Sequence, residues 1–181
     1  ASVLPLRYQC ALLVSLIAFG LYANTLNHEY TVDDATVLAR NHFTTQGVTA
    51  IPDILTTAYR RGFWERPDSL YRPLSVAMFA VEWQFWPNNP HPGHWINVVL
   101  FALTAWCLFL MLFALFSGTY VIPFFVTLLF VVHPIHTEVV ANIKRLDEIL
   151  CLLLFRLTLY WVFDFLKGAK ISKLILASLS Y

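Results

Sequence analysis

Residues 95–116 read WINVVLFALTAWCLFLMLFALF, and this stretch decides the class of fold. It carries no charged side chain from end to end. A helix needs about 20 consecutive apolar residues to cross the hydrocarbon core of a bilayer, which is roughly 30 Å thick. The stretch therefore predicts a membrane-spanning helix, and the rest of the chain can be interpreted around it.

The composition of the whole chain favours a membrane protein. Hydrophobic residues make up 59% of it and charged residues only 13%, whereas about a quarter of an average soluble domain is charged. The net charge of +1 excludes a nucleic-acid-binding protein, which needs a concentrated basic surface. The three cysteines, Cys10, Cys107 and Cys151, lie inside apolar runs. This placement favours packing over a disulfide framework or a metal site.

Further apolar segments extend the prediction to an all-α integral membrane protein, a bundle of several spans. We predict spans at about residues 10–27, 94–116, 120–133 and 148–166, with another beginning at 171–181. The last segment is too short to cross a bilayer, so we expect this chain to be part of a longer polypeptide.

The third segment is also short. Its apolar run of about fourteen residues covers roughly 21 Å of the membrane core. The polar sequence HPIHTE, residues 133–138, is therefore expected to begin below the membrane surface. Polar residues at that depth must line a protein-walled or water-filled cavity.

Residues 28–93 are predicted to form a long extracytoplasmic loop. The loop is rich in polar and aromatic residues, and we expect its short helices to lie along the membrane interface, where Trp and Tyr are favoured. Arg7 precedes the first span, and Lys167, Lys170 and Lys173 follow the fourth. The positive-inside rule places these cations in the cytoplasm. Counting spans then puts the loop and HPIHTE together on the opposite side.

Two adjacent carboxylates, Asp33 and Asp34, stand in this loop just after the first span. In one interpretation Asp34 caps a helix that begins at ATVLAR while Asp33 is solvated, because Asp is a favoured N-cap residue. In the other, one of the two is a general base, because crowding of two carboxylates raises one pKa. In an extended backbone they would point in opposite directions, so only one can face a cavity.

Two further motifs offer polar candidates. Arg72, in YRPL, precedes a proline, which disfavours helical backbone. Its guanidinium can bind phosphate oxygens or contact lipid headgroups. His94 and Asn97, in HWIN, share one face at the start of the second span. They can bind substrate or form hydrogen bonds between helices.

In HPIHTE, His133, His136 and Glu138 are predicted to line a polar cavity. The alternative, a metal site, is not favoured because their spacing matches no established zinc pattern. Lys144 and Arg145 follow on the same side. They can neutralise a phosphate leaving group or contact headgroups.

Arg156 falls near the middle of the fourth span. An arginine at that depth costs about 2.5 to 3.5 kcal/mol on insertion scales. The sequence therefore predicts that Arg156 faces a partner or a cavity.

The order of these motifs resembles one family. A first span followed by DD, then YRPL, then HWIN at the entry of a span, then FVVHPIHTE is similar to the transmembrane and tetratricopeptide-repeat O-mannosyltransferase-like proteins. These belong to the GT-C class of membrane glycosyltransferases. The resemblance runs from about Leu21 to Phe165.

The resemblance implies a multi-span enzyme of the bacterial plasma membrane or the endoplasmic reticulum. Such an enzyme transfers a sugar, mannose, from dolichyl or undecaprenyl phosphate to Ser or Thr hydroxyls of an acceptor protein on the extracytoplasmic side. Its partners are membrane lipids, the donor, the acceptor and other membrane subunits. No cofactor besides the lipid-linked donor is expected, and a divalent metal ion is not favoured. Later spans and tetratricopeptide repeats are expected outside this chain.

The same resemblance implies roles for the candidates. Asp33 or Asp34 deprotonates or orients the acceptor hydroxyl, and Arg72 with Lys144 or Arg145 holds the lipid phosphate. The residues His133, His136 and Glu138 line the sugar or acceptor pocket.

Two departures from the family pattern support an alternative. Leu146 stands where the family has an arginine, and Arg156 interrupts a span that is normally apolar. Either Arg145 takes over the phosphate contact, or the chain is a non-catalytic subunit that anchors a larger complex.

Overall fold

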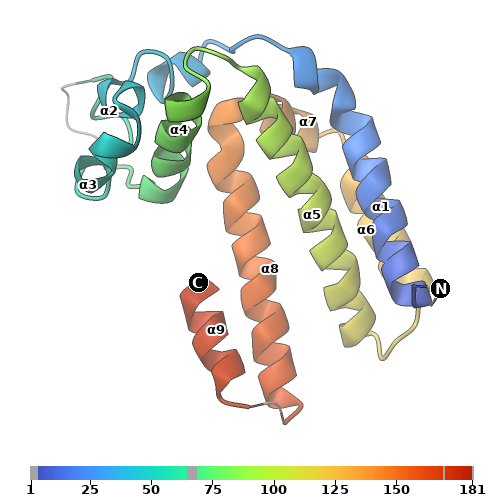
Figure 1. Ribbon diagram of the computed structural model, residues 1–181. Coiled ribbons are helices and arrows are strands. Elements are labelled where there is room, and N and C mark those ends of the chain that lie inside the picture. The colour runs from blue at the N-terminus through green and yellow to red at the C-terminus, as the bar shows by residue number, and fades with distance from the viewer. Residues whose placement is uncertain (1–3, 65–68, 169, 181) are drawn as a thin grey trace. The chain divides into compact units, whose positions relative to one another are not determined.

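The computed structural model describes residues 4–64, 69–168 and 170–180, and the regular elements in these ranges are helices (Figure 1). The all-α prediction is confirmed for this part of the chain. The chain divides into two compact units. The membrane unit comprises Ala1–Ala23, Val98–His136 and Glu148–Tyr181, and the polar unit comprises Asn24–Asn97 and Thr137–Asp147.

Among the described residues, three helical stretches are long and apolar enough to cross a membrane: Leu6–Asn27, His91–Leu115 and Ile143–Leu166. They contain α1 (Leu6–Tyr22), η1 (Ala23–Asn27), α5 (His91–Leu115), η4 (Ile143–Arg145) and α8 (Leu146–Leu166). Such helices are those of an integral membrane protein. Two apolar helices are shorter, namely α6 (Val121–Val132) and α9 (Ser172–Ser180). The 12 residues of α6 extend about 18 Å.

Small residues bring α1 and α5 close together in the membrane unit. Ala11 and Val14 of α1 and Phe109 of α5 have no exposed surface and form one core cluster. The hydroxyl of Ser15 donates a hydrogen bond of 2.8 Å to the carbonyl of Ala102. Because lipid tails are as apolar as these side chains, van der Waals packing and interhelical hydrogen bonds hold such helices together.

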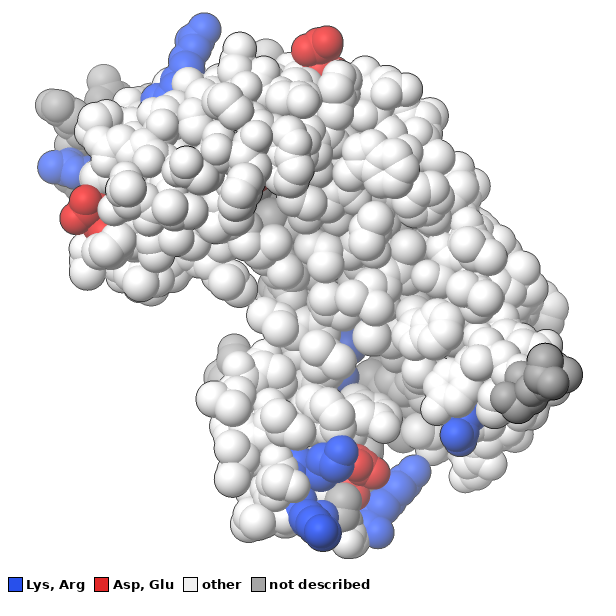
Figure 2. Space-filling view, viewed as in Figure 1, with Lys and Arg blue, Asp and Glu red and all other residues white. Residues whose placement is uncertain are grey.

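The helices α8 and α9 are joined by polar contacts. The hydroxyls of Thr158 and Ser180 lie 2.9 Å apart, and Lys173 forms an ion pair of 3.5 Å with Asp164. Lys173 also lies over the ring of Trp161, 4.1 Å from its centroid. Figure 2 shows that most of the visible face is uncharged and that basic side chains gather where α8 meets α9.

The polar unit is built on α4 (Pro73–Phe85), which packs against a group of short helices. These are α2 (His42–Thr45), η3 (Gly47–Ala50) and α3 (Ile51–Ile54), and η2 (Asp34–Thr36) precedes them in the chain. Asn41 caps α2, because its side-chain oxygen accepts from the backbone N–H groups of Phe43 at 3.1 Å and Thr44 at 3.3 Å. Phe79 of α4 is fully buried. A further short helix, α7 (His136–Ala141), begins at His136.

Gly93 lies where α5 closely approaches the segment after α7. A Cβ at this position would lie 2.6 Å from Cγ2 of Ile143 and 3.0 Å from Oε1 of Glu82. Ile143 is fully buried and cannot move aside. We expect Gly93→Ala to lower the free energy of unfolding by about 1 to 3 kcal/mol through overpacking.

The measurement is thermal unfolding of the detergent-solubilised protein. The matched control is Gly20→Ala, because nothing lies within 4 Å of a Cβ at Gly20. Equal melting temperatures for the two variants would contradict this account of the polar unit.

Candidate functional site

Asp34 is a fully buried carboxylate that binds two backbone N–H groups. Its Oδ2 accepts from Thr31 at 2.8 Å, and its Oδ1 accepts from Lys144 at 2.8 Å. The carboxylate thus joins the loop after α1 to the segment after α7. No side-chain cap bond occurs at the start of η2. The interpretation of Asp34 as a helix cap is therefore wrong, because its oxygens serve these two N–H groups instead.

Asp33 points elsewhere and is accessible. Its side chain is 55% exposed, and its Oδ2 accepts a hydrogen bond of 2.7 Å from the ammonium of Lys144, whose side chain is 11% exposed. The single residue Lys144 therefore binds both carboxylates, Asp34 through its backbone and Asp33 through its side chain. One interpretation of the sequence had the side chain of Asp33 solvated only. The structure shows that this side chain is also paired with a cation.

Three cations act on Asp33. The hydrogen bond and the charge of Lys144, followed by the charges of Arg145 and Arg60, hold the pKa of Asp33 below its ordinary value. Arg145 is also paired with Glu138, with 3.0 Å between Nη2 and Oε1. Lys144, Arg145 and Arg60 are thus cations near one exposed carboxylate, and cations so placed can attract an anion such as a phosphate.

Arg72 is engaged within the polar unit. It forms an ion pair with Asp147, and its guanidinium lies over the ring of Tyr59, 5.3 Å from the centroid. The hydroxyl of Tyr59 donates to the backbone carbonyl of Lys144 at 3.3 Å. The backbone of Arg72 has φ −141° and ψ 60°, which is outside the helical region, as the following proline predicted.

His94 and Asn97 are both fully buried. The side-chain amide of Asn97 donates to the carbonyl of Asn142 at 2.9 Å and to that of Val140 at 3.4 Å. His94 packs edge to face against His28, with 6.0 Å between ring centroids. The contacts of Asn97 match the interpretation in which it forms hydrogen bonds within the fold, and they fix the segment that leads to Lys144.

The histidines of HPIHTE belong to the membrane unit. His136 packs on the rings of Phe130 and Phe101, with centroid distances of 4.3 Å and 5.3 Å. The ring of His133 lies 6.3 Å from that of His136, and His133 is exposed. Within the part of the chain that the structure describes, no three or more His, Cys, Asp or Glu side chains are grouped to hold a metal ion. A role of these residues in a sugar pocket stays a prediction.

Glu82 of α4 is a buried carboxylate in the polar unit that sequence reasoning did not select. It is 4% exposed, and burial, with a further contribution from the charge of Asp34, raises its pKa to about 7. Burial, followed by the charges of Glu82 and Asp34, raises the pKa of Tyr30 to about 12. The signal that could have found Glu82 was its isolation in the apolar run VAMFAVEW.

Arg60 and Tyr59 were also missed. Both stand in AYRRGFW, which was interpreted as part of an interfacial helix. The structure places Arg60 near Asp33 and Tyr59 between Arg72 and the backbone of Lys144. Neither contact has a local sequence signal, because both join segments far apart in the chain.

The two carboxylates are expected to differ in their effect on stability. Asp34→Asn removes one of two acceptor oxygens from a fully buried site, so we expect a loss of about 1 to 3 kcal/mol of unfolding free energy. Asp33→Asn breaks only a partly exposed ion pair, which contributes at most about 1 kcal/mol. Thermal unfolding of both variants measures the difference, and a larger loss for Asp33→Asn would refute the assignment.

The pKa of Glu82 predicts a dependence of stability on pH. Because its pKa is about 7 in the folded state and 4.5 for the ordinary group, the folded protein binds a proton more tightly than the unfolded chain. Stability from this group is therefore full below about pH 4.5 and is lost as pH rises through 7. We expect Glu82→Gln to be more stable than the wild type at pH 8 and equal to it near pH 4.5.

The matched control for this measurement is Glu138→Gln, which makes the same charge change at a side chain that is 73% exposed. We expect its melting temperature to follow the wild type across the pH range. A wild-type advantage over Glu82→Gln at pH 8 would show that Glu82 is stabilised as a carboxylate, contrary to this account.

Comparison with known proteins identifies relatives. "Protein O-mannosyl-transferase Tmtc1" of Drosophila melanogaster is 33% identical over 144 residues, which is 76% of this chain and 16% of the relative. "Protein O-mannosyl-transferase TMTC1" of Homo sapiens is 31% identical over 138 residues, 75% of this chain and 16% of the relative. "Protein O-mannosyl-transferase TMTC3" of Mus musculus is 30% identical over 156 residues, 81% of this chain and 16% of the relative.

No protein-family model and no solved structure matches the chain. The chain spans about one sixth of the length of the three relatives above, since each is covered over 16%. Most of this chain is nevertheless included in each match. The family resemblance found in the sequence is thereby confirmed, and the chain is a homologue of the TMTC protein O-mannosyl-transferases over this part of their length.

Proposed function

We propose that this chain is part of the membrane portion of a GT-C type glycosyltransferase. It transfers mannose from a polyprenyl phosphate, dolichyl or undecaprenyl, to Ser or Thr hydroxyls of an acceptor protein on the extracytoplasmic side. The observation that carries the proposal is the exposed carboxylate of Asp33 among the cations Lys144, Arg145 and Arg60. The names of the relatives support a transferase and do not favour the non-catalytic subunit.

Asp33 is better placed than Asp34 to act on a substrate. The oxygens of Asp34 are buried and bound to two backbone N–H groups, so they cannot accept a proton from an incoming hydroxyl without loss of the fold. Asp33 is exposed, and its carboxylate accepts a hydrogen bond from the side chain of Lys144. We assign the general base to Asp33 and a positioning role to Asp34.

The reaction then uses these groups as follows. The acceptor hydroxyl attacks the anomeric carbon of the donor sugar, and Asp33 accepts the hydroxyl proton as the new C–O bond forms. The bond between the sugar and the phosphate breaks, and the phosphate leaves with the electron pair. Cations held near the developing negative charge stabilise it more than the ground state. Lys144, Arg145 and Arg60 are the residues placed to do this.

The ion pair between Lys144 and Asp33 gives donor binding a second effect. Lys144 lowers the pKa of Asp33, so Asp33 is a weak base while the pair is intact. When the ammonium of Lys144 turns to the donor phosphate, Asp33 loses its hydrogen-bond donor and its pKa rises. The carboxylate becomes a stronger base once the donor is bound.

Arg72 contributes by position. Arg72 forms an ion pair with Asp147 and contacts the ring of Tyr59, and Tyr59 donates a hydrogen bond to the backbone of Lys144. These contacts hold the backbone segment that carries Lys144. Asn97 holds the preceding residues through its bonds to Val140 and Asn142. Both side chains therefore orient Lys144 in this proposal, and Arg72 can still reach a phosphate if its pair with Asp147 opens.

The test of the proposal is sugar transfer from a radiolabelled polyprenyl-phosphate mannose to acceptor peptide in isolated membranes. Asp33→Asn is expected to lower kcat at least about 100-fold, the smaller end of general-base contributions, while its melting temperature stays near that of the wild type. Wild-type transfer by Asp33→Asn would sink the catalytic assignment.

Lys144→Met supplies an independent readout in the same assay. Without Lys144 the pKa of Asp33 returns toward its ordinary value, so the acid limb of kcat/KM is expected at higher pH than in the wild type. The KM for the donor should rise as well, because a phosphate contact is lost. Lys170→Met, an exposed cation of the membrane unit, is the charge-matched control and should leave both unchanged.

A further inference from the structure

The proposed reaction gives no role to Arg156, the charged residue in the middle of α8. Arg156 is only 6% exposed, and its Nε and Nη1 atoms have no hydrogen-bond partner among the described residues. Its guanidinium lies over the ring of Phe130, 4.7 Å from the centroid. A cation–π contact offsets only part of the free-energy cost of burying a charge. A bound anion would offset more of this cost.

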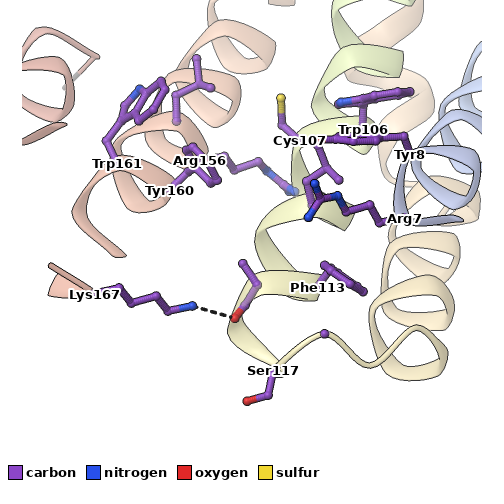
Figure 3. A pocket seen from close by; sticks show the side chains of 14 residues that line it. Arg7, Tyr8, Trp106, Cys107, Phe113, Ser117, Arg156, Tyr160, Trp161 and Lys167 are labelled. Carbon is purple, nitrogen blue, oxygen red and sulfur yellow. Dashed lines mark hydrogen bonds between the residues drawn. The ribbon is translucent and has the colours of Figure 1, made fainter. Parts of the chain in front are cut away.

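Arg156 also lines a cavity of about 630 Å³ within the membrane unit, together with other residues of α1, α5 and α8 (Figure 3). The sequence prediction that Arg156 faces a cavity is thus confirmed. The volume is in the range of sites for small molecules. Arg7 and Lys167 also line it, and no Asp or Glu is among its described lining residues.

Two of the cations that line the cavity come from the ends of helices. The ammonium of Lys167 donates to the carbonyl of Ala114 at 3.1 Å, which brings the end of α8 to the end of α5 (Figure 3). Arg7 lies in the first turn of α1. Arg156 precedes Lys167 by eleven residues, roughly 16 Å along a helix. The lining therefore has cations at the ends of two helices and one cation in the middle of α8.

Aromatic side chains make up much of the wall. Tyr8 and Trp106 stack with 6.3 Å between their ring centroids, and Tyr160 and Trp161 line the cavity from α8. Trp and Tyr are the residues that favour the level of lipid headgroups in a bilayer. Cations and interfacial aromatics without a carboxylate complement a molecule that is apolar at one end and anionic at the other.

We propose that this cavity binds the headgroup of an anionic membrane phospholipid. Arg156, Arg7 and Lys167 surround the phosphate, because guanidinium groups bind phosphate oxygens through paired hydrogen bonds. The aromatic wall contacts the start of the acyl chains. A bulk phospholipid is favoured over the sugar donor because Arg7 lies in the first turn of α1, whereas Asp33 follows the other end of that span.

The experiment measures thermal unfolding of the full chain in neutral detergent with added phosphatidylglycerol, phosphatidylcholine or undecaprenyl phosphate. A ligand that binds only the folded state raises its stability by an amount set by its concentration relative to Kd. We expect phosphatidylglycerol to raise the melting temperature saturably and phosphatidylcholine to have at least a tenfold weaker apparent Kd. Undecaprenyl phosphate should compete only weakly with phosphatidylglycerol for the cavity.

Arg156→Met is expected to weaken phosphatidylglycerol binding at least tenfold, while Arg156→Lys retains part of it. Lys170→Met removes a nearby cation that does not line the cavity and should bind as the wild type does. If Arg156→Met does not fold, the double variant Arg7→Met/Lys167→Met tests the two other cations of the same site. None of these variants alters a residue of the proposed catalytic region.

Three results would overturn the proposal. The first is no saturable effect of phosphatidylglycerol on the wild type, as expected if another part of the polypeptide fills the cavity. The second is an equal effect in the wild type and in the Arg156 variants. The third is Arg156-dependent stabilisation by undecaprenyl phosphate alone, which would assign the cavity to the donor lipid.

Discussion

The polar unit depends on one interaction, the pair of hydrogen bonds that the buried carboxylate of Asp34 accepts from the backbone of Thr31 and Lys144. A buried carboxylate without donors would be costly, and the same low dielectric makes its satisfied hydrogen bonds strong. The loop after α1 and the segment after α7 are thereby held at a fixed distance. The contacts of Tyr59 and Asn97 with that same segment add to this constraint.

The adjacent carboxylates take different roles because of the turn between them. Asp33 has backbone angles of −73° and −30°, so the chain turns there and the two side chains diverge. One carboxylate goes into the protein and holds Lys144 by its backbone, and the other stays accessible and meets the Lys144 ammonium. The arrangement places a candidate base and a candidate phosphate ligand side by side without leaving either charge unpaired.

The sequence predicted the features that the membrane imposes locally. All but the last residue of the uncharged run at residues 95–116 lies within α5, because a bilayer leaves few alternatives to a helix for such a stretch. A charge at Arg156 likewise had to face a cavity. The sequence could not divide the roles of Asp33 and Asp34, and local cap preference suggested a wrong role for Asp34. Those roles are set by contacts with Lys144, more than a hundred residues away, and such pairings have no local pattern. Arg60 and Tyr59 were missed for the same reason, whereas Glu82 did carry a local signal, its isolation in an apolar run.

The central claim is that Lys144 exchanges Asp33 for the donor phosphate while Asp34 stays in place. A cryo-EM structure of the full chain with a non-hydrolysable polyprenyl-phosphate sugar tests it most directly. The account predicts the Lys144 ammonium on the phosphate, the Asp33 carboxylate free beside the anomeric carbon, and Asp34 still bound to the N–H groups of Thr31 and Lys144. A bound donor with the Lys144–Asp33 pair intact, or with Asp34 facing the sugar, would contradict it.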